Sequence, residues 1–428
     1  NDRLNNIDKV THASGGCVVK SILSKFSIYK YALANIILVI GVFFFSVLVK
    51  SDPITDPSAP LSQQPTVKLD GTGIPKINIT TPEAGVSHNK FKQFNVSPNG
   101  LILNNSKIGG TSRIGGAVVG NPNLKDSGSA NVIINEVTGD TDSQLKGAIE
   151  VFGTRADVIL ANPNGVICNG CAFLNTGRAT LTTGRPVVNG SQVDLHVTEG
   201  VVVVEGDGLS APDGDAALVG RHVIIDGPVN ARDEAYVSGG TQYHDHNQRK
   251  SRAAPVVNGR DVLFSVDASE LGAMSAGQIR IHGNEAGLGV RAFGNLNSAG
   301  DIKIESAGDI AYRNANAAGK GIIRSNSDVT QYGNAIFGDT ISIAAGSYLL
   351  PLNAKLSSEK DVEINTDGLT QIEGEVTGDN IRIEARGGLK NSGFIMADGD
   401  LEIISGEGLS NFRRKLGIYD VTYENRYA

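Results

Sequence analysis

The chain has 428 residues with 53 glycines, no tryptophan and 5% aromatic residues, while its hydrophobic fraction is 40%. Glycine is enriched, but it follows no triplet period and the prolines number 14, which excludes collagen. The apolar content excludes wholesale disorder, and a net charge of −7 offers little attraction for nucleic acid, so we expect no nucleic-acid partner. These numbers predict a turn-rich chain with a core of Val, Ile, Leu and Ala.

An apolar run lies near the N-terminus, from Tyr31 to Val49, and its uninterrupted part begins at Ile36. Lysines precede the run, and an acidic, proline-rich stretch follows it. A positive flank, an apolar middle and a polar exit predict an extended signal peptide at residues 1–50, followed by a linker at 51–68. A retained membrane anchor is the alternative, because 19 residues nearly span a bilayer and no clear A-x-A cleavage site follows.

Three cysteines bear on the compartment. Cys17 precedes the apolar run, whereas Cys168 and Cys171 form a C-x-x-C pair. A zinc site of this kind needs a second pair, which the sequence lacks, so we expect no metal. In an exported chain the pair predicts a small local disulfide, with two free thiols in a turn as the alternative.

Past residue 60 the sequence carries strand and turn signals without a convincing amphipathic helix. Short aliphatic or alternating runs are bounded by Gly, Asn, Asp and Pro. Such runs occur at Ile77–Thr80, Leu101–Leu103, Val132–Ile134, Val158–Leu160, Val201–Val204 and Val223–Ile225. The pattern predicts an all-β fold.

The C-terminal half adds a repeat of about 20 residues, the length of one coil of a solenoid. Apolar and polar residues alternate in each copy, so one face is expected to point inward. The copies are QIRI at 278, DIKI at 301, GIIRSN at 321, TISI at 340, DVEI at 361, NIRI at 380 and DLEI at 400. A narrow parallel β-helix lumen would accept such aliphatic residues and exclude bulky aromatics. A β-sandwich is the alternative, although hairpins do not predict this recurrence, and the LxxLxLxxN spacing of leucine-rich repeats is absent.

Three proline-asparagine turns stand out, at Ser97–Gly100, Asn121–Leu124 and Asn162–Gly165. Proline presets the first central turn position and asparagine tolerates the second. The last two turns are about two coils apart, so they could fall at one edge of the helix. From the residues alone, these segments could also be turns and nothing more.

The stretch from Ile74 to Gly184 resembles the secretion domain of two-partner secretion exoproteins, the filamentous-haemagglutinin-like family. The motifs that carry the resemblance are GVSHNKFKQFNVSPNGLILNN, IGGAVVGNPNL, NVIINEVTG and EVFGTRADVILANPNGVICNGCAFLNTGRATLTTG. Residues 267–294 are similar to the stretch that follows this domain, and the later repeats look like haemagglutinin repeats. The C-x-x-C pair is similar to the subgroup of contact-dependent growth-inhibition proteins and large adhesins.

The resemblance implies a right-handed parallel β-helix with small extra-helical β elements. It also implies an exoprotein that is secreted or displayed on the surface of a Gram-negative bacterium. Periplasmic POTRA domains of an outer-membrane transporter would recognise it, and downstream regions would bind a receptor on a host or neighbouring cell. Its role would be adhesion or toxin delivery, and the alternative is a growth-inhibition toxin fragment without its C-terminal effector. The expected secretion determinants are the two signature turns, Asn121, Pro122, Asn123, Leu124, Asn162, Pro163, Asn164 and Gly165.

A β-helix enzyme acting on polysaccharides is the remaining alternative, and it needs clustered carboxylates. Asp301, Asp361 and Asp400 begin equivalent strands, but solvated strand starts explain them as well. His244 and His246 lie in a polar segment that we expect to be an exposed loop tip. No common catalytic motif is present, so we expect neither catalysis nor a cofactor.

The expected division of the chain follows from these signals. A secretion domain would occupy residues 69–300 and haemagglutinin-type repeats residues 301–410. The period fades after Ser410, so residues 411–428 are expected to form a non-repeat tail. We expect this chain to be a fragment or a natural truncation of a longer protein.

Overall fold

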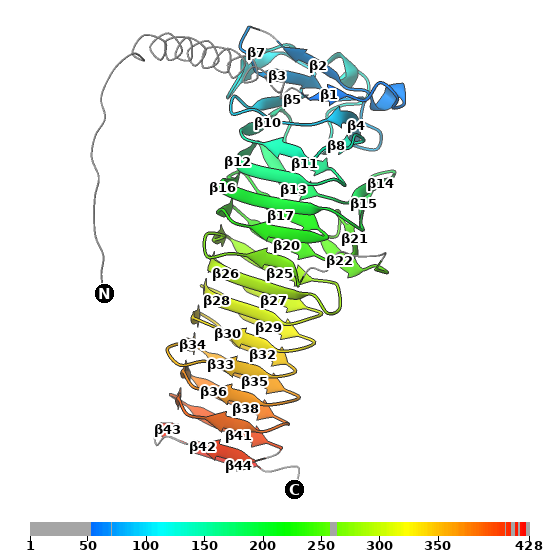
Figure 1. The fold of residues 1–428 in the computed structure, drawn as a ribbon. Coiled ribbons are helices and arrows are strands. Elements are labelled where there is room, and N and C mark those ends of the chain that lie inside the picture. Colours follow the sequence, from blue (N-terminus) through cyan, green and yellow to red (C-terminus); the bar gives the residue numbers. More distant parts are fainter. Residues whose placement is uncertain are drawn as a thin grey trace, which may run out of the picture. The chain divides into compact units, whose positions relative to one another are not determined.

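The computed structural model describes residues 53–69, 71–256, 263–406, 408–411, 416–417 and 420–424. The expected signal peptide at residues 1–50 lies outside the described residues. The regular elements of the described part are strands, apart from two short 3-10 turns, η1 (Leu61–Gln63) and η2 (Pro122–Leu124) (Figure 1). No helix in this part is long and apolar enough to cross a membrane.

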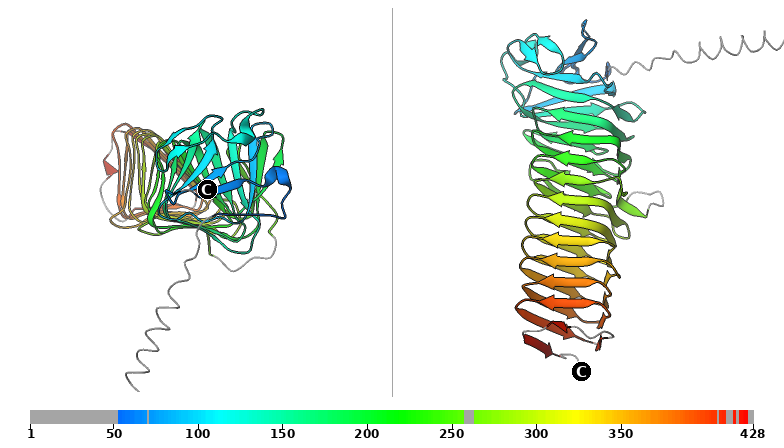
Figure 2. Two further views of the ribbon diagram at one scale, coloured as in Figure 1. Left: turned by 90° about the horizontal axis from the view of Figure 1, so that it is seen from above. Right: turned by 90° about the vertical axis from the view of Figure 1, so that its left-hand side faces the viewer.

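Sheet A, the first of two long sheets, stacks one strand from each coil (Figure 2). Its order is β1 (Ile54–Thr55), β4 (Val86–Gln93), β8 (Val132–Val137), β11 (Ala156–Ala161), β13 (Thr176–Thr182), β17 (Asp215–Gly220), β20 (Glu234–Gly239), β25 (Gln278–Gly283), β27 (Ile302–Ser306), β29 (Gly321–Ser325), β32 (Ile341–Ala345), β35 (Asp361–Thr366), β38 (Asn380–Ala385), β41 (Asp400–Ser405) and β44 (Asp420–Glu424).

Sheet B contains the other strands of the coils and bends between two parallel ladders. It comprises β2 (Thr66–Leu69), β3 (Pro75–Asn78), β5 (Leu101–Asn105), β9 (Ser143–Leu145), β10 (Ala148–Gly153), β12 (Val166–Leu174), β16 (Val201–Ala211), β18 (His222–Ile225), β19 (Val229–Ala231), β23 (Phe264–Ala268), β24 (Met274–Ala276), β26 (Gly289–Ser298), β28 (Ile310–Ala317), β30 (Val329–Gln331), β31 (Asn334–Phe337), β33 (Tyr348–Leu350), β34 (Lys355–Ser358), β36 (Thr370–Ile372), β37 (Glu375–Gly378), β39 (Leu389–Asn391), β40 (Phe394–Ala397), β42 (Leu409–Asn411) and β43 (Leu416–Gly417). Long strands such as β28 take part in both ladders, pairing with β30 and with β31.

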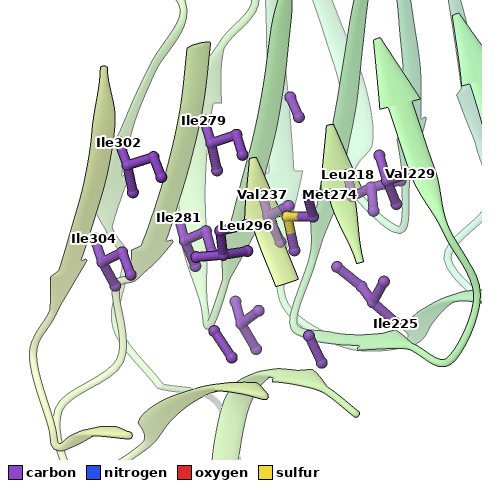
Figure 3. Close-up of a cluster of buried hydrophobic side chains, with 14 of the residues drawn as sticks. Leu218, Ile225, Val229, Val237, Met274, Ile279, Ile281, Leu296, Ile302 and Ile304 are labelled. Atoms are coloured by element: carbon purple, nitrogen blue, oxygen red, sulfur yellow. The ribbon is translucent and has the colours of Figure 1, made fainter. Parts of the chain in front are cut away.

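Stacked aliphatic side chains form the core of the coils. The inward positions of sheet A make an isoleucine ladder through Ile281, Ile304, Ile323, Ile343, Ile364, Ile383 and Ile403, each in register with the next. All seven are at most 2% exposed. Figure 3 shows Ile279, Ile281, Ile302 and Ile304 beside Leu296 and Met274 in this core. The expected parallel β-helix of about 20 residues per coil is therefore confirmed, and GIIRSN at 321 is the middle copy of the repeat.

The expectation that bulky aromatics are excluded from the lumen is wrong. Tyr312 and Tyr348 are fully buried, and their hydroxyls donate to the same oxygen, Oε1 of Gln331, at 2.6 and 2.9 Å. Gln331 in turn donates from Nε2 to the carbonyl oxygens of Gly333 and Lys355, both at 2.8 Å. An internal glutamine thus satisfies both phenols, which removes the cost of burying their polar ends.

The N-terminal edge of the solenoid is closed by residues that we expected to be a linker. Within residues 51–68, β1 pairs antiparallel with β4, and β2 pairs antiparallel with β3. Asp56 anchors this segment, because its Oδ2 accepts from Thr138 Oγ1 at 2.6 Å and lies 3.3 Å from Lys92 Nζ. An antiparallel strand at each sheet edge covers backbone groups that would otherwise remain open for pairing.

Two small sheets lie outside the coils, as predicted. One is the hairpin of β6 (Gly110–Ser112) and β7 (Gly116–Val118). The other is a four-stranded antiparallel sheet, here called the clasp, which comprises β14 (Arg185–Asn189), β15 (Gln192–Val197), β21 (Gln242–Asp245) and β22 (Lys250–Ala253) (Figure 1). The clasp buries an outward apolar strip of sheet A, because Val193 and Leu195 pack on Ile134, Ile159 and Ala161.

The tail differs from the expectation of a non-repeat segment. Strand β44 pairs parallel with β41, and Asp420 is in register with Asp400, 20 residues earlier. Val421 and Tyr423 occupy the register positions of Leu401 and Ile403. The segment DVTY is therefore a further copy of the repeat, in which tyrosine replaces the second aliphatic residue.

Candidate functional site

The first signature turn lies between the β6–β7 hairpin and β8. Asn121 caps η2: its side chain accepts from Asn123 N at 3.0 Å, while its Nδ2 donates to the carbonyl oxygens of Ile79 and Asn104, both at 3.0 Å. Asn123 Nδ2 also donates to Ile79 O, at 2.9 Å. Asn121 and Leu124 are buried, so the turn is held from within rather than displayed.

The second signature turn connects β11 to β12 and uses the same chemistry. Asn162 is fully buried, and its Nδ2 donates to Thr141 O at 2.9 Å and to Ser143 Oγ at 3.0 Å. Its Oδ1 accepts from the backbone N–H of Asn164 at 3.0 Å, and Asn164 Nδ2 donates to Gly139 O at 2.7 Å. Both asparagines therefore bind the turn to the preceding coil.

Two of the three turns end in glycine, because the backbone of the next coil lies too close for a side chain. Gly165 has a φ of +142° and Gly100, in the turn that begins at Ser97, has a φ of +90°. A Cβ on Gly100 would lie 2.7 Å from Ala148 O, and one on Gly165 would lie 3.1 Å from Val201 O. A side chain at either position would thus meet the backbone of the next coil.

The sequence spacing allows the two signature turns to share one edge of the helix, but the structure places them apart. The turn at Asn121 precedes a sheet A strand, whereas the turn at Asn162 follows one. They therefore lie at opposite ends of the sheet A strands. The hairpin β6–β7, which adds residues between β5 and β8, removes the simple relation between sequence spacing and corner.

Cys168 and Cys171 form a disulfide inside β12, and both are buried in the core. The strand bends between them, where the register with β16 shifts and Gly170 has a φ of +79°. The neighbouring strand turns the same corner with two left-handed glycines, Gly206 and Gly208. The bridge therefore fixes a coil corner just after the second signature turn.

The candidate catalytic residues do not assemble. In sheet A, Asp361 is in register with Asn380, and Asn380 lies between it and Asp400. Asn380 bridges the two, donating from Nδ2 to Asp361 Oδ1 at 2.9 Å and accepting from Asp400 N at 3.0 Å. Across the residues that the structure describes, no group of three or more His, Cys, Asp or Glu side chains could hold a metal ion.

The expectation of an exposed loop tip around His244 and His246 is wrong. His244 lies on β21 of the clasp and is fully buried, and His246 is 3% exposed. Alternation in QYHD places Gln242 and His244 on the inner face of a strand, a pattern that polar composition concealed.

A basic hollow of about 460 Å³ lies between β22 and sheet A, and it is lined by Arg252, His282, Glu305 and Arg324 among others. Its charged groups already have partners within the chain. Glu305 pairs with Lys303 at 2.9 Å and lies 3.7 Å from Arg324, and Arg252 stacks over the Tyr243 ring at 4.3 Å.

The comparisons with known proteins agree with this architecture. The family model of the TPS secretion domain matches residues 51–312. The chain is 38% identical over 346 residues to a 16S rRNA endonuclease CdiA of Enterobacter cloacae, covering 78% of this chain and 10% of that protein. It is 42% identical over 264 residues to the filamentous hemagglutinin of Bordetella pertussis, covering 59% of this chain and 7% of that protein.

A solved structure, the filamentous hemagglutinin secretion domain, superposes with a TM-score of 0.58 at 32% identity. The match covers 72% of this chain and 97% of that one. This chain thus spans about a tenth of the length of the curated relatives it matches. With the family model matched over more than half of its residues, the chain belongs to the TPS secretion-domain family.

Proposed function

We propose that this chain is the export module and first stalk segment of a secreted or surface-displayed exoprotein of a Gram-negative bacterium. A cognate outer-membrane transporter with POTRA domains would export it. The observation that carries the proposal is the match of the TPS secretion domain to residues 51–312, on a β-helix that contains both signature turns. Within that module we assign residues 69–300 to secretion and residues 301–410 to the stalk.

The fold suits stepwise export. Each coil pairs with the coils directly before and after it, so folding can proceed coil by coil without closing long loops. An isolated coil cannot bury its apolar face, which favours an unfolded chain until neighbours are available. We propose that the coils form in order after the chain emerges from the transporter.

The signature turns would act before or during folding. Asn121 is 1% exposed and Asn162 is fully buried, so a partner cannot reach their amides in the folded domain. Recognition by POTRA domains would therefore use the unfolded turns, or the turns would act by setting the corners of the first coils.

The test is co-expression of the full chain with its cognate transporter, followed by measurement of the protein in the culture supernatant. Asn121→Ala and Asn162→Ala should each reduce secretion at least several-fold. Asn99→Ala is the matched control, because Asn99 lies in the third turn and is exposed. Secretion by both variants equal to that of the control would remove the turns from the secretion determinant.

Binding of the urea-unfolded chain to purified POTRA domains separates recognition from folding. Weaker binding of Asn162→Ala would assign the turn to recognition. Unchanged binding with reduced secretion would assign it to the coil corner.

The regions responsible for adhesion or toxin delivery would lie outside this chain. The second candidate function of the whole protein is that of a growth-inhibition toxin. The CdiA relatives are nucleases by name, but this chain matches about a tenth of each. We propose that the chain itself is not catalytic, and the separated carboxylates of sheet A support this over the polysaccharide-active alternative. Fusing the chain to a reporter domain and finding it outside the cell would support its role as a carrier.

A further inference from the structure

The interface between the clasp and sheet A contains a buried histidine that lacks one hydrogen-bond partner. His244 is fully buried on β21, and its Nδ1 lies 2.9 Å from Ser251 Oγ on β22. Its Nε2 has no hydrogen-bond partner among the described residues. The ring faces the Tyr236 ring of β20, at 5.5 Å between centroids.

The basic groups around this ring oppose a second proton, whereas the Asp245 carboxylate favours it. Arg178 of β13 and Arg280 of β25 face it from sheet A, while Asp245 and His246 flank it on its own side of the clasp. Asp215 and Glu234 compensate the two arginines: Arg178 lies 3.2 Å from Asp215 and 3.8 Å from Glu234, and Arg280 also pairs with Glu234. His246 has its own carboxylate, since its Nε2 lies 3.1 Å from Asp157 Oδ2. Burial, with smaller effects of His246 and Arg178, lowers the pKa of His244 to about 3.

We propose that the clasp is released by acid: protonation of His244 undocks β14, β15, β21 and β22 from sheet A and exposes the apolar strip beneath them. A neutral imidazole leaves one nitrogen unpartnered in this site. An imidazolium carries two N–H donors. Among the described residues only the donor on Nδ1 has a hydrogen-bond partner, so the second would be a buried donor next to arginines.

The direction of the effect follows from linkage. In the released clasp the ring is solvated and takes up its proton near pH 6.5, whereas in the docked clasp it stays neutral down to about pH 3. Release therefore becomes more favourable as the pH falls below about 6.5, by about tenfold per pH unit. At pH 5.0, where most carboxylates are still ionised, the fraction of released clasp should be about 30-fold higher than at pH 7.5.

Burial also lowers the pKa of His282 on β25, so the coil strand beside β22 is not a neutral reference. Residues 302–345 contain no histidine, so this part of the solenoid should keep its hydrogen bonds over the same range. Acid would thus loosen the clasp and leave these coils in place. The strip that becomes accessible includes Ile134, Ile159 and Ala161.

The test is amide hydrogen exchange of the full chain at pH 7.5 and 5.0, corrected for the intrinsic effect of pH on exchange. In the wild type, protection of residues 185–197 and 242–253 should fall about 30-fold at pH 5.0, while residues 302–345 of the coils keep theirs. His244→Gln cannot be protonated and should retain its protection. His196→Gln is the matched control, because His196 is a partly exposed histidine of the same sheet, and it should respond like the wild type.

Equal protection of the wild-type clasp at both pH values would overturn the proposal. So would a His244→Gln variant that loses protection at pH 5.0 to the same extent as the wild type. If glutamine does not hold the clasp at pH 7.5, His244→Leu provides a second non-titrating variant with an apolar side chain for this site, and the same two outcomes apply to it.

Discussion

The side-chain amide of Asn162 donates a hydrogen bond to the carbonyl oxygen of Thr141, 2.9 Å away and one coil earlier. Asn121 makes the same kind of contact with Ile79 at the opposite end of the sheet A strands. The backbone ladders are interrupted where the chain turns from one sheet to the next, and buried carbonyl groups there still need donors. The signature asparagines supply those donors, which gives the motif a structural role that precedes any role in recognition.

Asn162→Ala should therefore destabilise the N-terminal coils by about 1–3 kcal/mol, because the substitution leaves buried groups without partners. Urea unfolding followed by hydrogen exchange of residues 132–182 would measure the loss. The control is Asn99→Ala, whose side chain is exposed. Equal urea midpoints for the two variants would show that the Asn162 amide contributes nothing to these coils.

Removing the disulfide should have a smaller, local effect. The double substitution Cys168→Ser and Cys171→Ser opens a loop of only a few residues, for which chain entropy predicts a loss of about 2 kcal/mol at most. We expect a lower urea midpoint for the coils around β12, with no change in residues 302–405. A double variant with wild-type stability in β12 would mean that Gly170 alone sets this corner.

The solenoid could be predicted from the sequence because each copy of the repeat can be recognised from a few residues. Each copy places aliphatic side chains two positions apart, and the structure stacks them as one ladder from Ile281 to Ile403. The copy at residue 420 does not match the repeat pattern, because Tyr423 stands where the other copies have an aliphatic residue. Tyr312 and Tyr348 show that coils of this solenoid can bury a phenol when an internal polar group satisfies its hydroxyl.

The clasp and the N-terminal cap, which is the segment at residues 54–69 that contains β1 and β2, could not be predicted in the same way. Their contacts join segments far apart in the chain, such as His246 with Asp157 and Asp56 with Thr138, and no periodicity links these pairs. The corner positions of the signature turns were hidden for a similar reason, since the β6–β7 hairpin breaks the count of residues per coil. The family resemblance identifies the residues of the secretion determinant, whereas only the structure shows the hydrogen bonds that they make.

The isoleucine ladder allows a matched pair of substitutions in one strand. Ile343 is 1% exposed and stacks between Ile323 and Ile364, whereas the neighbouring Ser342 points outward. Ile343→Ala should cost about 2–5 kcal/mol, because it removes buried methyl groups and leaves a cavity. Ser342→Ala should stay within about 0.5 kcal/mol of the wild type.

Hydrogen exchange of the adjacent coils is the appropriate measurement, since solenoids need not unfold in a single step. Faster exchange in β29, β32 and β35 of the Ile343 variant, with little change in β4 and β8, is the expected result. A uniform loss of protection over the whole chain would instead indicate that the coils unfold as one cooperative unit.

The cap at the N-terminal edge should detach in acid through Asp56. Hydrogen bonds from Ser58 and Thr138 hold the pKa of this carboxyl well below its usual range. In a detached cap the group would titrate near its ordinary value of about 3.9, so its stabilising effect is complete above that pH and is lost as the pH falls below it. Amides of residues 54–69 should therefore be protected at pH 6 and lose protection below about pH 4.

Asp56→Asn should show weak protection of these amides at both pH values, whereas Asp140→Asn, at an exposed position, should follow the wild type. Strong protection of the cap in Asp56→Asn at pH 6 would mean that strand pairing of β1 with β4 and of β2 with β3 holds it without the carboxylate.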